Sequence, residues 1–322
     1  MGRLRRRLLL ITGVLLAALL GALPARAQAP VVGVLAFAER SQAFQDAFRQ
    51  GLRDHGYAEG RNIAVEWRWA EGNAERADAL AAELVALKVR VIVAVLTPAV
   101  RAASKATAAI PIVMAPAGPG FVKNLARPEG NITGISGFSA ELSGKRLEIL
   151  RELVPGLRRV AVLLNRADPV FAKNMRAETE EAARKSGIGV QAVTVGTPGE
   201  IEAAFAAMAK EKAAAIIQPS LVVPSARAAQ VAKLAVRNRV ALASQSAEFV
   251  EAGGLMAYGA NFRELYRYTA VYVHKLLAGA KPGELPVERA SRTELSINAG
   301  TAKALGLRPP ISVLMRADRV IE

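Results

Sequence analysis

The chain has no cysteine among its 322 residues and only two histidines. The absence of cysteine excludes disulfide bonds, thiolate catalysis and the lipid anchor that needs a cysteine after an N-terminal apolar segment. His55 ends a predicted helix and His274 lies within another, so both are interpreted as surface residues, away from the loops where open α/β sheets place ligand groups. Without cysteines or paired histidines, the sequence predicts no metal ion.

The N-terminus has the order of charge, apolar core and small residues that is typical of a secretory signal peptide. Four arginines lie within the first seven residues, residues 8–23 are almost entirely apolar, and ARA at 25–27 fits a cleavage site. The apolar run is short for a membrane-spanning helix, which needs about 20 residues. We expect residues 1–27 to be removed, leaving a periplasmic protein without a lipid anchor.

Sequence motifs of common enzymes are missing. There is no G-x-S-x-G nucleophile elbow, no P-loop and no G-x-G-x-x-G fingerprint, and GPG at 118–120 is only a fragment of a glycine-rich loop. A periplasmic hydrolase is the enzyme alternative, but the chain offers it no nucleophile–base pair. We therefore expect no enzymatic activity and no cofactor.

The net charge is +15, of which five charges belong to the expected signal peptide. The basic residues are interspersed with acidic ones, no basic tail is present, and no helix-turn-helix pattern precedes the first strand. Basicity of this kind does not predict nucleic-acid binding. A solvated basic surface that keeps the protein near an anionic membrane is the favoured interpretation.

Short apolar, β-branched runs alternate with amphipathic helical stretches along the mature chain. Such runs predict buried parallel strands covered by helices on both faces of a sheet. The predicted strands lie at 31–37, 62–69, 89–95, 111–115, 132–138, 159–165, 190–195, 213–219, 240–245 and 255–259. The predicted helices lie at 42–55, 74–87, from Pro98 onward, and at 170–186, 200–210, 224–238 and 261–278.

The strand–helix series restarts near residue 159, which predicts an α/β protein of two Rossmann-like lobes. The chain is expected to cross between them near 137–143, 258–261 and 286–293. Lobe 1 would then hold residues 28–137 plus about 259–287, and lobe 2 would hold 138–258 plus about 288–322. Trp67 and Trp69 share one strand face with Ile63 and Val65, and we predict that this face is packed core.

In parallel sheets the carboxyl ends of the strands face the crevice where ligands bind. Thr97 is predicted to cap the helix that begins at Pro98, whose N-terminus would suit a carboxylate. Ala117 and Gly118 lie in a small-residue loop that would let a ligand approach the backbone. The remaining candidates also lie at strand ends: Asn165, Ser220, Gln245 and Tyr258 in lobe 2, with Phe37 and Phe138 as apolar walls.

Eleven segments spread along the mature chain form a specific pattern: FRQGLR at 48–53, GY at 56–57, EGRNI at 59–63, EWRWAEG at 66–72, IPIV at 110–113, LARP at 125–128, GNITG at 130–134, ELSGKRL at 141–147, FVEAGGLM at 249–256, YGAN at 258–261 and AKALGL at 302–307. In these segments the sequence resembles the ABC-transporter substrate-binding family that includes tryptophan- and tyrosine-type binding proteins. The resemblance spans nearly the whole mature chain. It implies the type I periplasmic-binding fold, with three hinge strands and closure on a ligand.

One departure concerns ligand specificity. Family members usually carry a GDPV-like stretch after the strand at 111–115, whereas here the loop is about four residues shorter and its acid is missing. The loop between Phe37 and Phe44 also looks shortened. If the missing acid normally pairs with an amino group, this chain would bind something other than a standard amino acid.

The resemblance implies a monomeric binding protein that delivers a small molecule, amino-acid-like or a related carboxylate, to an ABC permease in the inner membrane. A ligand-sensing receptor for a membrane signalling protein would use the same fold and is the main alternative. A sugar ligand is disfavoured because only 5% of the residues are aromatic and few of these fall at strand ends.

Overall fold

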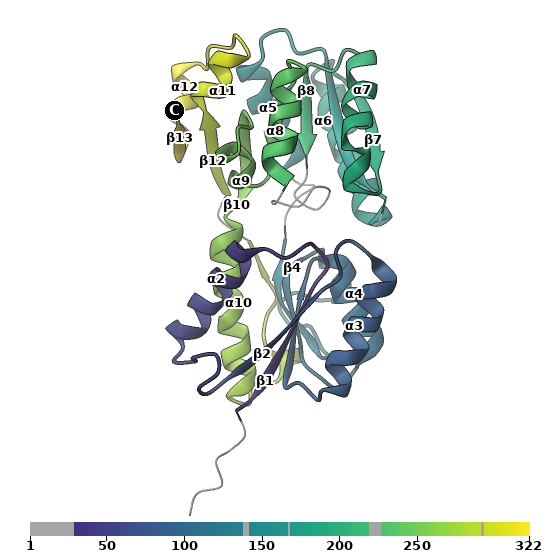
Figure 1. Cartoon of the computed structure of the whole chain (residues 1–322), viewed down its shortest axis with the longest axis vertical. Coiled ribbons are helices and arrows are strands. Elements are labelled where there is room, and N and C mark those ends of the chain that lie inside the picture. Colours follow the sequence, from purple (N-terminus) through teal and green to yellow (C-terminus); the bar gives the residue numbers. More distant parts are fainter. Residues whose placement is uncertain (1–28, 138–141, 167, 219–226, 291–292) are drawn as a thin grey trace, which may run out of the picture.

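The computed structural model describes residues 29–137, 142–166, 168–218, 227–290 and 293–322. The expected signal peptide, Phe138 and Ser220 lie outside these ranges. Two α/β lobes stand one above the other and are joined along one side (Figure 1). None of the helices in the described part of the chain combines the length and apolar character needed to cross a bilayer.

The first lobe is built on a six-stranded sheet in which every described strand pair is parallel. Helices α3 (Ala74–Ala86) and α4 (Thr97–Ala106) pack together on one face, and α2 (Gln42–Asp54) and α10 (Phe262–Leu277) pack together on the other. The strands, in spatial order, are β11 (Glu288–Arg289), β5 (Ile132–Ser136), β4 (Ile112–Ala117), β3 (Val91–Val95), β1 (Val31–Ala36) and β2 (Ala64–Trp69).

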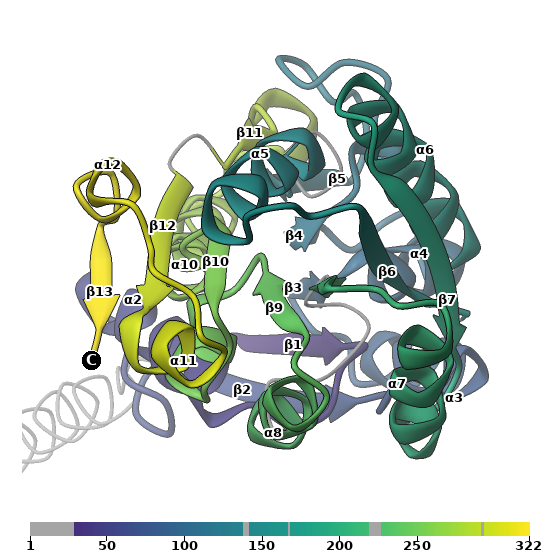
Figure 2. The same cartoon turned by 90° about the horizontal axis from the view of Figure 1, so that it is seen from above.

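The second lobe has a seven-stranded sheet. Helices α5 (Ser143–Leu153) and α6 (Pro169–Lys185) lie together on one face, and α7 (Ile201–Lys210) and α8 (Ala228–Arg237) lie on the other, as Figure 2 shows from above. The strands, in order, are β13 (Arg319–Ile321), β12 (Thr293–Asn298), β10 (Met256–Ala260), β9 (Ala241–Ser244), β8 (Ala215–Gln218), β6 (Arg159–Asn165) and β7 (Gly189–Val195). Short helices α9 (Ala247–Glu251), α11 (Ala299–Ala304) and α12 (Ile311–Leu314) complete it.

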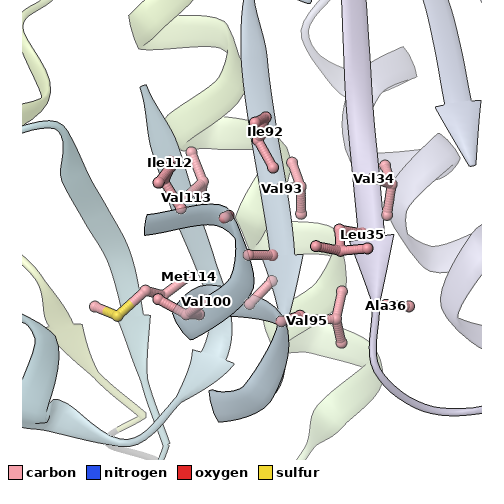
Figure 3. Packing of buried hydrophobic residues seen from close by; sticks show 14 of the residues in the cluster. Val34, Leu35, Ala36, Ile92, Val93, Val95, Val100, Ile112, Val113 and Met114 are labelled. Atoms are coloured by element: carbon pink, nitrogen blue, oxygen red, sulfur yellow. The ribbon is translucent and has the colours of Figure 1, made fainter. Parts of the chain in front are cut away.

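Apolar side chains on the central strands form the core of the first lobe. Val34, Ile92 and Val93 are fully buried, and Val100 of α4 packs down onto the strands (Figure 3). At roughly 25 cal/mol per Å² of apolar area removed from water, side chains of this kind each stabilise the fold by about 1.5–3 kcal/mol. This burial holds the strand ends in register and therefore positions the loops that follow them.

The two tryptophans pack as predicted. Trp67 and Trp69 stack with ring centroids 5.9 Å apart, and Phe44 of α2 meets each of them edge-on. Trp69 belongs to the buried core and Trp67 packs against it, so the strand face at Ile63, Val65, Trp67 and Trp69 is core rather than a ligand platform.

Three crossings connect the lobes: after β5, between β10 and α10, and between β11 and β12. Asn261, at the second crossing, caps α10 by accepting a hydrogen bond from the Glu264 backbone N–H at 3.1 Å. Its amide also donates to Glu294 of β12 at 3.1 Å. One side chain therefore ties two of the three crossings together.

The structure confirms the two-lobed α/β fold with parallel sheets. One strand pair differs from the expected pattern, because β12 runs antiparallel to β10 after returning from the first lobe. The sheets also assign the crossings to particular residues: β10 stays on the second sheet as far as Ala260, and β11 pairs with β5 on the first.

Candidate functional site

The first lobe presents backbone and small side chains at its cleft edge. After β3, Leu96 has a φ of 75°, a left-handed conformation that is strained for a β-carbon-bearing residue. The Thr97 hydroxyl accepts a hydrogen bond from the Gly118 N–H at 3.1 Å, which joins the loops after β3 and β4. Both loops therefore have a fixed shape at the edge facing the second lobe.

The prediction that Thr97 caps α4 was wrong. Leu96 occupies the N-cap position, Thr97 is the first helical residue, and within the described chain no side chain caps this helix. The cause is the strained turn at Leu96, which directs the Thr97 hydroxyl toward the Gly118 N–H instead of toward its own helix. The uncapped N-terminus keeps the partial positive charge that favours an anion.

A small, mainly apolar cavity of about 50 Å³ lies between the lobes. A cavity of this size has room for only a few water molecules in this arrangement of the lobes. None of the described residues that line it is charged. The lining consists of Leu96, Thr97, Pro116, Ala117, Gly118 and Gly137 from the first lobe, Phe171, Gln245 and Ala260 from the second, and Phe262 and Leu265 from the start of α10.

Gln245 is the polar side chain that the second lobe contributes to this cavity. It is only 4% exposed, and its amide oxygen has no hydrogen-bond partner among the described residues. Gly259 of β10 lies close to the Gln245 backbone, since a β-carbon there would come within 2.1 Å of the Gln245 backbone carbonyl oxygen. A buried acceptor left without a partner is unfavourable unless something else binds it.

Asp168 lies beside the cavity at the N-cap of α6. Its Oδ1 accepts from the backbone N–H of Phe171, which itself lines the cavity, at 3.2 Å. The side chain is 2% exposed, and Oδ2 has no partner within the described ranges. Burial raises the pKa of Asp168, while the hydrogen bond from Phe171 and the charge of Arg101 on α4 act in the lowering direction.

The sequence-based candidates fall into three groups. Thr97, Ala117, Gly118 and Gln245 come together at the cavity. Pro98 and Phe37 are buried in the first lobe, Phe37 in its core, but neither lines the cavity, and Asn165 ends β6. Phe138 and Ser220 lie outside the described residues.

Tyr258 is engaged within the second lobe. Its backbone carbonyl accepts from the Arg146 Nε at 2.7 Å, and its hydroxyl accepts from Thr293 at 3.1 Å. Arg146 is almost completely buried, and this burial lowers its pKa to about 10. The guanidinium therefore anchors β10, one of the strands that leads into a crossing.

Sequence reasoning missed several residues of the site. Phe171, Phe262 and Leu265 belong to the first turns of helices, which sequence reasoning did not search because it looked only at strand ends. A signal for Asp168 was present: an Asp-Pro pair separated by two residues from the end of a predicted strand is typical of an N-cap followed by the first helical residue. The one charged contact across the lobes, among the described ion pairs, joins Glu39 to Arg227 at 3.8 Å.

No group of three His, Asp or Glu side chains in the described ranges is placed to hold a metal ion. What the geometry provides is a small interlobe cavity with an anion-favouring helix terminus on one side, the unpartnered amide oxygen of Gln245 on the other, and apolar walls between them. The family model described as ABC transporter substrate binding protein matches residues 32–321. The chain belongs to this family.

Known substrate-binding proteins are similar over most of the chain. The tyrosine-binding protein of Clostridioides difficile (strain R20291) is 28% identical over 266 residues, covering 81% of this chain and 76% of that protein. The crystal structure of an ABC domain in complex with L-Trp from Streptococcus pneumoniae is 26% identical, with a TM-score of 0.83 over 91% of this chain and 99% of that one. The architecture is the type I periplasmic-binding fold.

The arrangement of the lobes is informative. A ligand-free, open substrate-binding protein with adhesive properties from Clostridium difficile is also 26% identical. This comparison again covers 91% of this chain and 99% of that one, but the TM-score is 0.64. Although identity and coverage are the same in the two comparisons, the structure of the present chain is more similar to the Trp complex than to the open form. That agrees with its small interlobe cavity and with the Glu39–Arg227 contact across the lobes.

Proposed function

We propose that this chain is the extracytoplasmic solute-binding protein of an ABC importer. In this proposal the exported, monomeric protein binds an amino-acid-like molecule or a related carboxylate between its lobes and delivers it to a permease in the inner membrane. The observation that carries the proposal is the interlobe cavity, which is lined from both lobes and from the start of α10. No catalytic step is part of it.

Closure on the ligand follows from the placement of the contacts. The ligand carboxylate meets the uncapped N-terminus of α4, the apolar part lies against Phe171 and Phe262, and Gln245 contacts it from the other lobe. Contacts with both lobes exist only in the closed state, so the ligand stabilises that state by its difference in affinity. The permease would then recognise the closed form.

A thermal-unfolding screen of ligand-stripped protein tests binding. Amino acids, aromatic carboxylates, nucleosides and sugars are each added, and a binder present at a hundredfold excess over its Kd should raise the free energy of unfolding by about 2.7 kcal/mol. Gln245→Leu should abolish most of this stabilisation, whereas Gln230→Leu on the exposed surface of α8 should keep it. If no compound stabilises the unmodified protein, solute binding is refuted.

Delivery is tested by uptake. A strain lacking this chain should lose import of the radiolabelled ligand, and re-expression should restore it. If binding is intact but import is unchanged while a transcriptional or motility response to the ligand disappears, the protein serves a membrane receptor and the importer assignment is wrong.

A further inference from the structure

Helix α12 has apolar side chains on both its inner and its outer side. Val313 is fully buried and Leu314 packs against the core of the second lobe, as expected for the inner side of a surface helix. The outer side carries Ile311 and Met315, one helical turn apart, which are 75% and 82% exposed. A surface helix normally has polar residues there. The outer side of α12 is therefore an apolar surface that no described residue covers.

Exposed apolar side chains are concentrated in this part of the molecule. Three of the five large hydrophobic side chains that are exposed in the described chain lie within residues 311–320, namely Ile311, Met315 and Val320 of β13. The other two, Leu87 and Tyr268, lie apart from one another on the first lobe. Single apolar residues at a surface are normal, whereas a group of them indicates an interaction site.

The location of α12 keeps this surface away from the cleft. The edge strand β13 and helix α12 lie at one margin of the second lobe, on the side opposite α7 and β7 (Figure 1, Figure 2). The described lining of the interlobe cavity includes no residue of α12 or β13. The surface therefore stays accessible whether or not the cavity is filled.

Basic side chains flank the two most exposed apolar ones. Arg308 lies three residues before Ile311, Arg316 directly follows Met315, and both arginines are exposed. Residues 303–320 contain four basic residues and one acid, which gives the segment a net charge of +3. A negatively charged partner would be attracted to this segment, whereas a second copy of the same segment would be repelled.

Neighbouring acids neutralise only part of this charge. Glu152 binds Arg316 at 2.7 Å, and Glu251 binds Arg319 at 2.8 Å. Arg308 takes part in none of the ion pairs among the described residues. Because β13 has only three residues and begins with an arginine, it is poorly suited to edge-to-edge pairing with a second chain. These observations favour an anionic surface over a second copy of this chain.

We propose that Ile311 and Met315, with Arg308 beside them, form a contact site for the anionic surface of a lipid bilayer. The two apolar side chains enter the boundary between headgroups and acyl chains, and the arginine binds a lipid phosphate. The helix has four residues, so it lies on the bilayer and does not cross it. This contact goes beyond solute binding: it holds the protein reversibly at the membrane with or without a ligand.

Flotation with lipid vesicles, using the protein without its expected signal peptide, tests this contact. The vesicles contain phosphatidylethanolamine with about one-third phosphatidylglycerol, and neutral phosphatidylcholine vesicles are the comparison. The double variant Ile311→Ser/Met315→Ser removes the apolar contact, and Arg308→Gln removes one charge. Leu87→Ser and Arg61→Gln make the same kinds of change at exposed positions of the first lobe and are the controls.

The unmodified protein should bind the anionic vesicles at least about tenfold more tightly than the neutral ones, and less tightly as salt rises from about 0.05 to 0.5 M. The double variant should lose at least about tenfold in affinity for the anionic vesicles. Arg308→Gln should lose about fivefold, and both controls should stay within about twofold. All variants should keep the urea midpoint of the unmodified protein, because the altered side chains are exposed.

Two results would overturn the inference. One is that the unmodified protein does not prefer anionic vesicles to neutral ones, and the other is that the double variant binds anionic vesicles as tightly as the unmodified protein. Analytical ultracentrifugation tests the alternative occupant. If the unmodified protein forms a dimer that the double variant does not form, and neither binds vesicles, the surface joins two copies of this chain. Solute binding is measured without vesicles and is unaffected by any of these results.

Discussion

The two lobes have similar architecture but contribute different chemistry to the cleft. The first lobe supplies backbone and small side chains: the strained turn at Leu96, the α4 N-terminus, and Gly118 bonded to Thr97. The second lobe supplies a buried polar side chain with an unused acceptor, Gln245. Backbone groups fit any carboxylate, whereas a side-chain acceptor selects what else the ligand carries. Specificity is therefore expected to reside in the second lobe.

The largest expected effect is a loss of stability when the close approach of Gly259 to the Gln245 backbone is disturbed. Gly259→Ala would place a β-carbon 2.1 Å from the Gln245 carbonyl oxygen, so the backbone of one of the two segments must move. We expect the free energy of unfolding to fall by about 3 kcal/mol, and ligand-induced stabilisation to be lost, in urea titrations with and without ligand. Gly118→Ala in the first lobe, with a nearest contact of 3.4 Å, should lower stability by less than about 1 kcal/mol. Equal losses of stability in Gly259→Ala and Gly118→Ala would contradict the difference between the two lobes.

A smaller effect is expected at the first-lobe edge. Thr97→Val removes the hydroxyl that accepts from the Gly118 N–H and leaves this donor without its partner. Stability should fall by about 1–2 kcal/mol, and affinity for amine-bearing and amine-free carboxylates should fall by the same factor. Thr107→Val is the comparison in this lobe, since that hydroxyl accepts from the backbone N–H groups of Ala109 and Ile110, which do not line the cavity. If Thr97→Val changed the preference between the two ligand classes, selectivity would not be confined to the second lobe.

The smallest effect is a pH dependence of the ligand-free protein. Because burial raises the folded-state pKa of Asp168, the folded state binds this proton more tightly than the unfolded state does. This contribution to stability is present at low pH and is lost as the pH rises from the unfolded value near 4 through the raised folded value. Urea unfolding from pH 3.5 to 7 should show a decline that Asp168→Asn lacks. Parallel curves for the two proteins would mean that this carboxyl is not perturbed.

Much of the fold could be predicted from the sequence because its strands are continuous apolar runs. A run such as 91–95 or 159–165 is buried on both faces and has one plausible role, the interior of a parallel sheet. The C-terminal elements gave no such signal. The strand β12 contains polar residues at both ends and pairs antiparallel with β10 only because the chain returns from the other lobe, which is a long-range property.

The site was predictable to the extent that it lies at strand ends. Thr97, Ala117, Gly118 and Gln245 were found in this way. The residues that were missed depend on geometry that spacing does not show. Phe262 reaches the cavity because α10 starts at a crossing. Leu96 takes the N-cap position of α4 because the Thr97 hydroxyl accepts a hydrogen bond from Gly118, 21 residues further along the chain.

The stacked pair Trp67 and Trp69 has a spectroscopic consequence. These are the only tryptophans in the chain, and both lie on one strand of the first lobe, whereas the second lobe contains a single tyrosine, Tyr258. Tryptophan fluorescence therefore reports the first lobe alone, while far-ultraviolet circular dichroism reports both. Unfolding curves that coincide by the two signals would show that the lobes unfold as one unit, and curves that separate would give each lobe its own midpoint without any label.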